Sequence, residues 1–128
     1  MTDGERLAWA AGFFDGEGCI LVMGGTQLCM SVTQVDRAPL DRLTEILGGR
    51  VHGPRPNRGF RPIFEWKIAS SPGVVQALRH LLPFLTCKHA QAVAAIGFPL
   101  NQKGQRLSDG VRIQRFVIDA ELRLLKKI

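Results

Sequence analysis

The stretch that decides the fold of this chain reads Leu7-Ala8-Trp9-Ala10-Ala11-Gly12-Phe13-Phe14-Asp15-Gly16-Glu17-Gly18-Cys19-Ile20. It begins as an apolar helix of small residues and ends in two acids, Asp15 and Glu17, that stand between glycines. The negative end of a helix dipole disfavours acids, and local rules are broken more often at functional sites. Carboxylates on a tight turn also suit a hard divalent cation. The stretch therefore predicts a functional site, with a solvated polar turn as an equal alternative.

The residues after this stretch alternate with a period of two, which is typical of β-strands. Apolar side chains occupy every second position on both sides of Gly24-Gly25-Thr26, and a three-residue loop that contains glycine is a common hairpin connection. This loop pairs position 20 with 30 and position 22 with 28. Because that register brings both apolar rows to one face, the sequence predicts a hairpin with one buried face.

The remaining elements follow from periodicity and from start and stop signals. We expect helices over 5–15, 39–47, 88–98 and 109–127, and one that starts near 71 and ends at about His80 or Leu82. A second hairpin is expected to begin at 50–52, to have a loop over 53–61 and to return over 63–68. Asp3, Asp36 and either Ser70 or Ser71 are the expected N-caps of the first three helices. This order predicts one α+β domain over residues 1–128, in which helices cover one face of a four-stranded antiparallel sheet and further helices follow at the C-terminal end.

Composition restricts the partner and the compartment. The chain has 128 residues, a formal net charge of +6 and a sequence pI of about 9.9. This charge favours a polyanionic partner but does not by itself separate DNA, RNA and a membrane surface. Cys19, Cys29 and Cys87 lack metal-ligand spacing and are expected to be reduced thiols. With no apolar run long enough for a bilayer and no signal-peptide pattern, we expect a cytoplasmic or organellar-matrix protein that has no membrane partner and is not secreted.

Residues 10–18, Ala-Ala-Gly-Phe-Phe-Asp-Gly-Glu-Gly, resemble the LAGLIDADG motif of homing endonucleases, with Ala for the first Leu and Glu for the second acid. The segment 31–34 (Ser-Val-Thr-Gln) is similar to the end of that family's second strand. The segment 82–91 (Leu-Pro-Phe-Leu-Thr-Cys-Lys-His-Ala-Gln) is similar to a family segment whose lysine reaches the active site. The resemblance covers most of the chain and implies an αββαββα fold with a saddle-shaped sheet. It also implies site-specific, double-strand DNA cleavage by metal-assisted phosphodiester hydrolysis.

The resemblance implies roles for individual residues around the motif. Glu17 is the expected metal ligand, with the carbonyl oxygen of Gly16 as a second ligand, and Mg²⁺ or alternatively Mn²⁺ is the expected cofactor, without any small-molecule cofactor. Lys88 is expected to polarise a water molecule or steady the phosphoanion, and Gln34 to orient the nucleophilic water. Arg37 is a further candidate for the active site. Asp15 is expected to be structural, at the crossing of two helices.

A stripe of small residues on the first helix bears on the oligomeric state. Ala8, Gly12 and Gly16 follow one another at intervals of four and allow another backbone to come close. Such a stripe usually packs on a helix of the same chain, but in a two-fold dimer it would bring together one acid-tipped helix from each copy. Because the chain carries one motif, the resemblance implies a homodimer on a near-palindromic site, with Ala8, Gly12, Asp15 and Gly16 in the interface.

The face of the sheet opposite the apolar rows is the expected DNA-binding surface. A two-stranded ribbon fits the major groove of DNA, where Arg, Gln and Glu side chains can read bases. The first hairpin is short and directs Cys19, Leu21 and Met23 outward, so its contribution to base reading is expected to be modest. The candidates for DNA contact are Gln27, Cys29, Ser31, Arg50, His52, Arg55, Arg58, Arg61, Glu65 and Lys67.

Two other functions remain open from the sequence. One is a binding module of the same fold without cleavage activity, such as an RNA maturase or a transcription regulator. The retention of Glu17 and Lys88 disfavours it. The other is a small basic RNA- or ribosome-associated protein, for which only the net charge argues.

Overall fold

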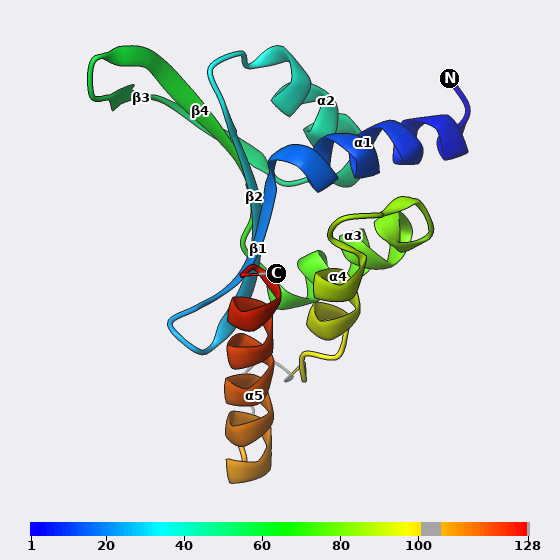
Figure 1. Ribbon diagram of the computed structural model, residues 1–128, viewed down its shortest axis with the longest axis vertical. Coiled ribbons are helices and arrows are strands. Elements are labelled where there is room, and N and C mark those ends of the chain that lie inside the picture. The colour runs from blue at the N-terminus through cyan, green and yellow to red at the C-terminus, as the bar shows by residue number, and fades with distance from the viewer. Residues whose placement is uncertain (101–105, 128) are drawn as a thin grey trace.

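The computed structural model describes residues 1–100 and 106–127 and has the predicted α+β architecture (Figure 1). Helices pack on one face of a four-stranded antiparallel sheet with the strand order β1-β2-β4-β3. The elements in chain order are α1 (Asp3–Glu17), β1 (Gly18–Met23), β2 (Gln27–Gln34), α2 (Ala38–Leu47), β3 (Arg50–Asn57), β4 (Phe60–Ile68), α3 (Ser71–Leu81), the 3₁₀ turn η1 (Leu82–Phe84), α4 (His89–Ile96) and α5 (Asp109–Leu125).

Helix α1 begins one residue after its N-cap, Thr2, and not after Asp3, which corrects the sequence prediction. The Thr2 hydroxyl accepts the Glu5 N–H at 3.1 Å, and the Glu5 carboxylate accepts the Thr2 N–H at 3.1 Å. This reciprocal capping box satisfies two donors that the first helical turn leaves free. The backbone N–H of Thr2 and, to a smaller extent, its side chain hold the pKa of the Glu5 carboxyl below its ordinary value.

The helix continues through Glu17, two residues beyond the predicted end, and leads directly into β1. Phe14 is completely buried beneath this junction, and a Cβ atom on Gly18 would collide with the Phe14 ring. Glycine is therefore required at position 18 because the strand passes close to an aromatic side chain of the preceding helix. The two acids stay on the last turn of a continuous helix as a result.

The first hairpin has the predicted register. Ile20 pairs with Met30, and Val22 pairs with Leu28, across a turn in which Gly24 and Gly25 have positive φ values. Both apolar rows face the helices and join the core. The large side chains that are buried completely or almost completely there are Phe14, Ile20, Leu28, Met30, Val32, Leu40, Leu43, Trp66, Val74, Leu78, Leu81 and Leu122.

The second hairpin is longer than predicted, because the expected loop over 53–61 is mostly strand. Strand β3 runs to Asn57 and β4 starts at Phe60, so only Arg58 and Gly59 form the turn. The prolines of β3 misled the prediction, but β3 is an edge strand, where a residue without an N–H donor is tolerated. The pairing is irregular between His52 and Asn57. In Figure 1 this hairpin extends away from the helices.

The start of α2 differs from the prediction, and its end agrees. Arg37 occupies the N-cap position without a side-chain cap, whereas Asp36, the expected cap, forms an ion pair with Arg61 at 3.5 Å. The helix stops at Gly48 and Gly49, whose φ values are 81° and 87°. The Trp66 indole N–H donates to the Gly48 carbonyl at 2.9 Å and thereby fixes this stop against the sheet.

The C-terminal third is helical, with shorter elements than expected. Ser70 caps α3 by accepting the Gly73 N–H at 3.2 Å, as predicted, and Ser108 caps α5 by accepting the Val111 N–H at 3.2 Å. Helix α4 covers 89–96 and not 88–98, and α5 ends at Leu125 and not at 127. Among the described residues, no helix combines the length and the apolar character needed to cross a bilayer.

Candidate active site at the end of the first helix

Asp15 joins the end of α1 to a segment more than seventy residues away in the sequence. Its carboxylate accepts the backbone N–H of Thr86 at 2.7 Å and that of Lys88 at 2.9 Å. The Lys88 ammonium group in turn donates to the Asp15 carbonyl at 2.7 Å. Each of these three bonds has one charged partner, the Asp15 carboxylate or the Lys88 ammonium, which makes it stronger than a neutral hydrogen bond. Asp15 therefore fixes the 86–88 segment and holds the Lys88 ammonium at the C-terminal end of α1.

Glu17, the second acid of the motif, has a different environment. It is the last residue of α1, is exposed, and forms none of the ion pairs found among residues 1–100 and 106–127. The last backbone bond at this helix end runs from the Gly18 N–H to the Phe14 carbonyl, so the carbonyls of Gly16 and Glu17 come after the last carbonyl that accepts a bond in the helix. Asp15 has a structural contact, and Glu17 keeps a carboxylate available for a ligand.

The donor set of one chain is too small for a complete metal site. No group of three or more His, Cys, Asp or Glu side chains converges in the part of the chain that the structure describes. Both oxygens of Asp15 already accept backbone N–H groups, which leaves the Glu17 carboxylate and the nearby Gly16 carbonyl. These are hard oxygen donors of the kind that Mg²⁺ prefers. They fit a metal site that needs further ligands from outside this chain.

The stripe of small residues on α1 is uncovered. Ala8, Gly12 and Gly16 are exposed, and a Cβ atom on either glycine would have no neighbour within 4 Å. Beside the stripe, the rings of Trp9 and Phe13 stack with their centroids 5.4 Å apart. The described helices of this chain therefore do not occupy the stripe, which excludes the usual intramolecular explanation for it.

The structure places Gln34 and Arg37 near the end of β2. Gly18 pairs with Val32, so Gln34 lies two residues further along the strand next to the α1–β1 junction. Arg37 forms an ion pair with Asp41 at 3.1 Å, and its guanidinium lies 5.7 Å from the centroid of the Phe64 ring. In the described chain Arg37 has no hydrogen bond or ion pair with Asp15, Glu17 or Lys88, so its placement in the active site stays a prediction.

The outer face of the sheet arranges the candidate DNA-contacting residues in two rows across neighbouring strands. One row is Ser31, Lys67 and Arg50, and the next is Thr33, Glu65 and His52. The Lys67 ammonium lies 3.5 Å from the Glu65 carboxylate, and both side chains are largely covered. Thr33 belongs to this face by register, although the sequence analysis did not include it among the candidates.

Cys29 does not suit the predicted role in DNA contact. It lies on the outer face opposite Leu21, but only 2% of its surface is exposed. Burial raises the pKa of its thiol, with the Lys67 charge opposing this effect and the Glu65 charge adding to it. Alternation in the sequence assigns a residue to a face but does not show whether neighbouring side chains cover it. The DNA contact of Cys29 stays a prediction, which its burial disfavours.

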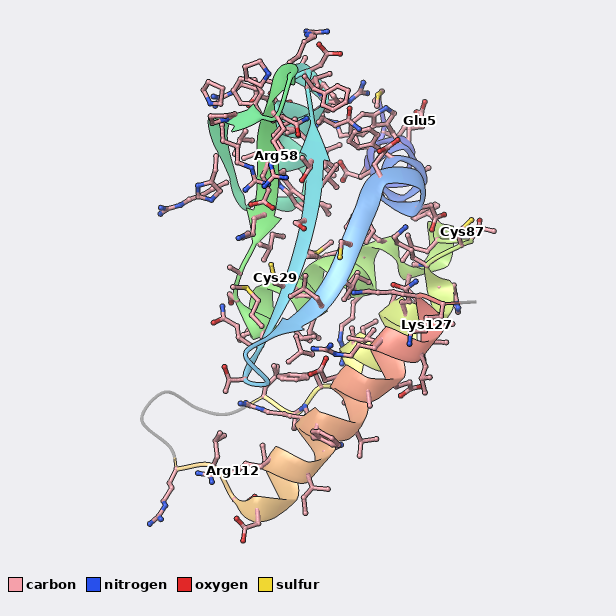
Figure 2. The ribbon with its side chains drawn as sticks, turned by 60° about the vertical axis from the view of Figure 1, so that its left-hand side comes forward. Glu5, Cys29, Arg58, Cys87, Arg112 and Lys127 are labelled. Atoms are coloured by element: carbon pink, nitrogen blue, oxygen red, sulfur yellow. The ribbon has the colours of Figure 1, made fainter. Side chains whose placement is uncertain are left out.

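The second hairpin presents the exposed basic candidates. Arg55, Arg58 and Arg61 are all exposed, and Arg58 lies in the turn (labelled in Figure 2). Phe60 follows this turn and is 77% exposed, the highest value among the large apolar side chains that the structure describes. Sequence reasoning missed Phe60, although an aromatic residue between arginines is a recognisable signal. A shallow cavity of about 460 Å³ is formed by this hairpin end alone.

Comparisons with known proteins identify the fold. No family model and no curated protein matches this chain. Among solved structures, the chain is similar to the homing endonuclease I-CvuI in complex with DNA, with 24% identity, a TM-score of 0.78 and coverage of 96% of this chain and 83% of the other. It is similar to the homing endonuclease I-TnaI at 21% identity and a TM-score of 0.67, covering 94% and 93%.

A third similar structure is the archaeal intron-encoded homing endonuclease I-Vdi141I complexed with DNA, at 18% identity, a TM-score of 0.59 and coverage of 96% and 99%. The chain thus has the homing-endonuclease fold over nearly its whole length, in agreement with its LAGLIDADG-like sequence. Sequence identities of 18% to 24% establish the fold, and the chemistry depends on the residues of this chain.

Proposed function

We propose that this chain is a site-specific DNA endonuclease that acts as a homodimer with a divalent metal ion, Mg²⁺ or alternatively Mn²⁺. The observation that carries the proposal is that the two acids at the end of α1 have different environments. Asp15 holds the 86–88 segment in place, Lys88 is held beside it, and Glu17 remains exposed and unpaired in the described chain. A carboxylate free to hold a divalent cation and an ammonium group fixed at the same helix end are groups that metal-assisted phosphodiester hydrolysis can use.

The residues of this chain would divide the work as follows. Glu17 and the Gly16 carbonyl would hold the cation, whose contribution is the activation of water and the neutralisation of phosphate charge. The Lys88 ammonium would sit against the scissile phosphate and stabilise the additional negative charge of the transition state. Gln34 would orient the attacking water by hydrogen bonding. No covalent intermediate on the protein is needed.

The homodimer is supported by two independent features of the described residues. The stripe of Ala8, Gly12 and Gly16 is open, so a second α1 can approach it closely. One chain also supplies too few metal ligands, and a second copy brings a second Glu17 to the same end of the crossing helices. A closed two-fold contact satisfies both, because each copy presents the same surface.

Double-stranded DNA is the proposed substrate because of the shape and charge of the outer face. The two rows of polar residues on the sheet continue into the basic second hairpin, and the structurally similar I-CvuI and I-Vdi141I are described as complexes with DNA. Arg55, Arg58 and Arg61 would contact phosphates or guanine edges. The side chains that would face the major groove of the DNA are those of Gln27, Ser31, Arg50, His52, Glu65 and Lys67.

The decisive experiment compares the wild-type protein with Glu17→Gln on a randomised DNA library, with Mg²⁺ and then Mn²⁺. We expect the wild type to select and cut a near-palindromic site, and Glu17→Gln to bind the selected site while its cleavage rate falls by about 10³-fold or more. The matched control is Glu121→Gln, an exposed glutamate on α5, which should cut normally.

Three results would contradict parts of the proposal. Normal cleavage by Glu17→Gln would refute the metal assignment. Tight binding by the wild type without cleavage in either metal would favour a binding module that has lost catalysis. A monomer that binds DNA in sedimentation measurements would refute the homodimer.

A further inference from the structure

Arg115 on α5 is the one charged residue buried within the described chain, with 7% of its surface exposed. Its guanidinium donates to the Pro99 carbonyl at 3.3 and 3.1 Å, and to the Thr26 carbonyl at 3.0 Å. The charged group also lies 5.0 Å from the centroid of the Phe98 ring. A buried charge is costly unless it is fully hydrogen-bonded, so this arrangement is specific to an arginine.

The guanidinium connects three parts of the fold that are distant in sequence. They are helix α5, the segment after α4 that contains Phe98 and Pro99, and the turn between β1 and β2 that contains Thr26. None of the ion pairs among the described residues includes Arg115, so carbonyl oxygens and an aromatic ring supply its polar environment. A planar fork with donors in a fixed geometry suits acceptors on two separate segments, whereas a lysine offers all its donors from one compact ammonium group.

The turn that Arg115 contacts has little rigidity of its own. Gly24 and Gly25 occupy two of its positions with φ values of 57° and 73°, and glycines leave a free chain highly flexible. A second tether lies on the other side, where the Leu28 N–H donates to the Ser71 hydroxyl at 2.9 Å. The hairpin is thus fixed near its turn from α5 and from α3.

We propose that Arg115 is a positioning residue, which holds the turn of the first hairpin in the position that allows Gln27 to contact DNA. Gln27 directly follows Thr26, whose carbonyl Arg115 binds, and pairs with Met23 at the end of the hairpin. A bidentate glutamine contact with a base needs the amide in a narrow range of positions. The inference rests on the proposed function, because it assigns to Arg115 the geometry of one DNA contact within it.

The first test does not depend on DNA. Hydrogen exchange is measured for Arg115→Met, Arg115→Lys and the control Arg112→Met, an exposed arginine on the same helix. We expect the amides of residues 24–28 to exchange about tenfold faster or more in Arg115→Met, while β3 and β4 stay unchanged. Arg115→Lys keeps the charge and should give a smaller increase. Exchange in 24–28 equal to that of Arg112→Met would overturn the inference.

The second test measures base preference by selection from a DNA library. Arg115→Met and Gln27→Ala should lose preference at the same base pairs, and the double variant should lose no more than either one. Preference at the base pairs contacted by the second hairpin should persist. A purely structural role would instead lower thermal stability and leave the preferences intact, which would overturn the inference. If the wild type selects no DNA, the proposed function fails, and the exchange result still decides whether Arg115 holds the turn.

Discussion

The two hairpins of the sheet are built differently, although they follow one another in the same chain. The first has six- and eight-residue strands, an apolar outer face around Leu21 and Cys29, and a turn that Arg115 and Ser71 hold from both sides. The second has strands of eight and nine residues, carries Arg55, Arg58 and Arg61, and extends beyond the helices (Figure 1). Contacts with other elements therefore hold the first hairpin near its turn, whereas the exposed positive charge lies on the longer second hairpin.

Tertiary packing explains this division. The first hairpin forms one edge of the sheet, and α5 contacts its strand β1. Its side chains therefore pack against residues of other elements and are not free to contact a ligand alone. The end of the second hairpin forms its shallow cavity from its own residues, and Arg61 there pairs with Asp36 outside the hairpin. Arg55 and Arg58 are exposed and present a charged, solvated surface. Four predictions test this comparison.

The largest effect is expected from removing the charge of the second hairpin. The triple substitution of Arg55, Arg58 and Arg61 by Ala should weaken DNA binding by about 10²-fold or more and should lower the salt slope of log K by up to about 3, because each phosphate contact releases about one counterion. Binding titrations at several salt concentrations measure both values. Gln27→Ala in the first hairpin should leave the salt slope unchanged. Equal slopes in the two variants would refute the comparison.

The next largest effect concerns the entry to the second hairpin. Gly49→Ala should destabilise the fold by about 3 kcal/mol, because the residue has a φ of 87° and a Cβ atom would lie 2.7 Å from the Lys67 carbonyl. Gly59→Ala in the turn has a φ of 76° but open space, so about 1 kcal/mol is expected. Urea denaturation gives both free energies of unfolding. A larger loss for Gly59→Ala would show that the turn, and not the entry, fixes this hairpin.

A thiol-labelling experiment tests whether the outer face of the first hairpin is closed. Cys29 is buried with a raised pKa, whereas Cys87 is exposed. Because the thiolate is the reactive form, alkylation of Cys29 by iodoacetamide should be at least about tenfold slower than that of Cys87 near neutral pH, and should still accelerate above about pH 9. Peptide mass spectrometry follows each site. Equal rates would mean that the face opens readily and that Cys29 is available to DNA after all.

The smallest effect is expected outside both hairpins, at the capping box of α1. The lowered pKa of Glu5 means that its contribution to stability is present above its ordinary value of 4.5 and is lost as the pH falls below it. Glu5→Gln should therefore have a slightly lower Tm than the wild type near pH 6, and the difference should vanish near pH 3. Calorimetry at both pH values checks this, and neither hairpin should show altered hydrogen exchange. A difference that grows in acid would have the wrong sign.

The sequence predicted the fold well where a local pattern was sufficient. The alternation on both sides of Gly24-Gly25-Thr26 gave the observed register, because a shift by one residue would expose every apolar side chain. It failed over 53–61, where prolines indicated a loop, because their tolerance depends on β3 being an edge strand. The cap of α1 was displaced by one residue, since Thr2 and Asp3 are both good caps and only the reciprocal bond with Glu5 selects Thr2.

The candidate site was predicted in part. Similarity to a known motif singled out Asp15, Glu17 and Lys88, and the structure brings Asp15 and Lys88 into contact. Residues 15 and 88 carry no periodic relation, so composition and spacing alone could not have joined them. Sequence patterns did not indicate the hydrogen bond from Thr86 or the burial of Arg115, because both depend on where distant segments meet.

Residues within a few positions of one another specify the element order, the faces of the first hairpin, the small-residue stripe and the acid-tipped helix, so each of these could be predicted locally. The packing of distant segments, in contrast, shows which acid is free. Asp15 receives two backbone N–H groups from the 86–88 segment, and Glu17 has no ion-pair partner among the described residues. Two similar carboxylates two positions apart thereby acquire different tasks, because packing satisfies one and leaves the other to a ligand.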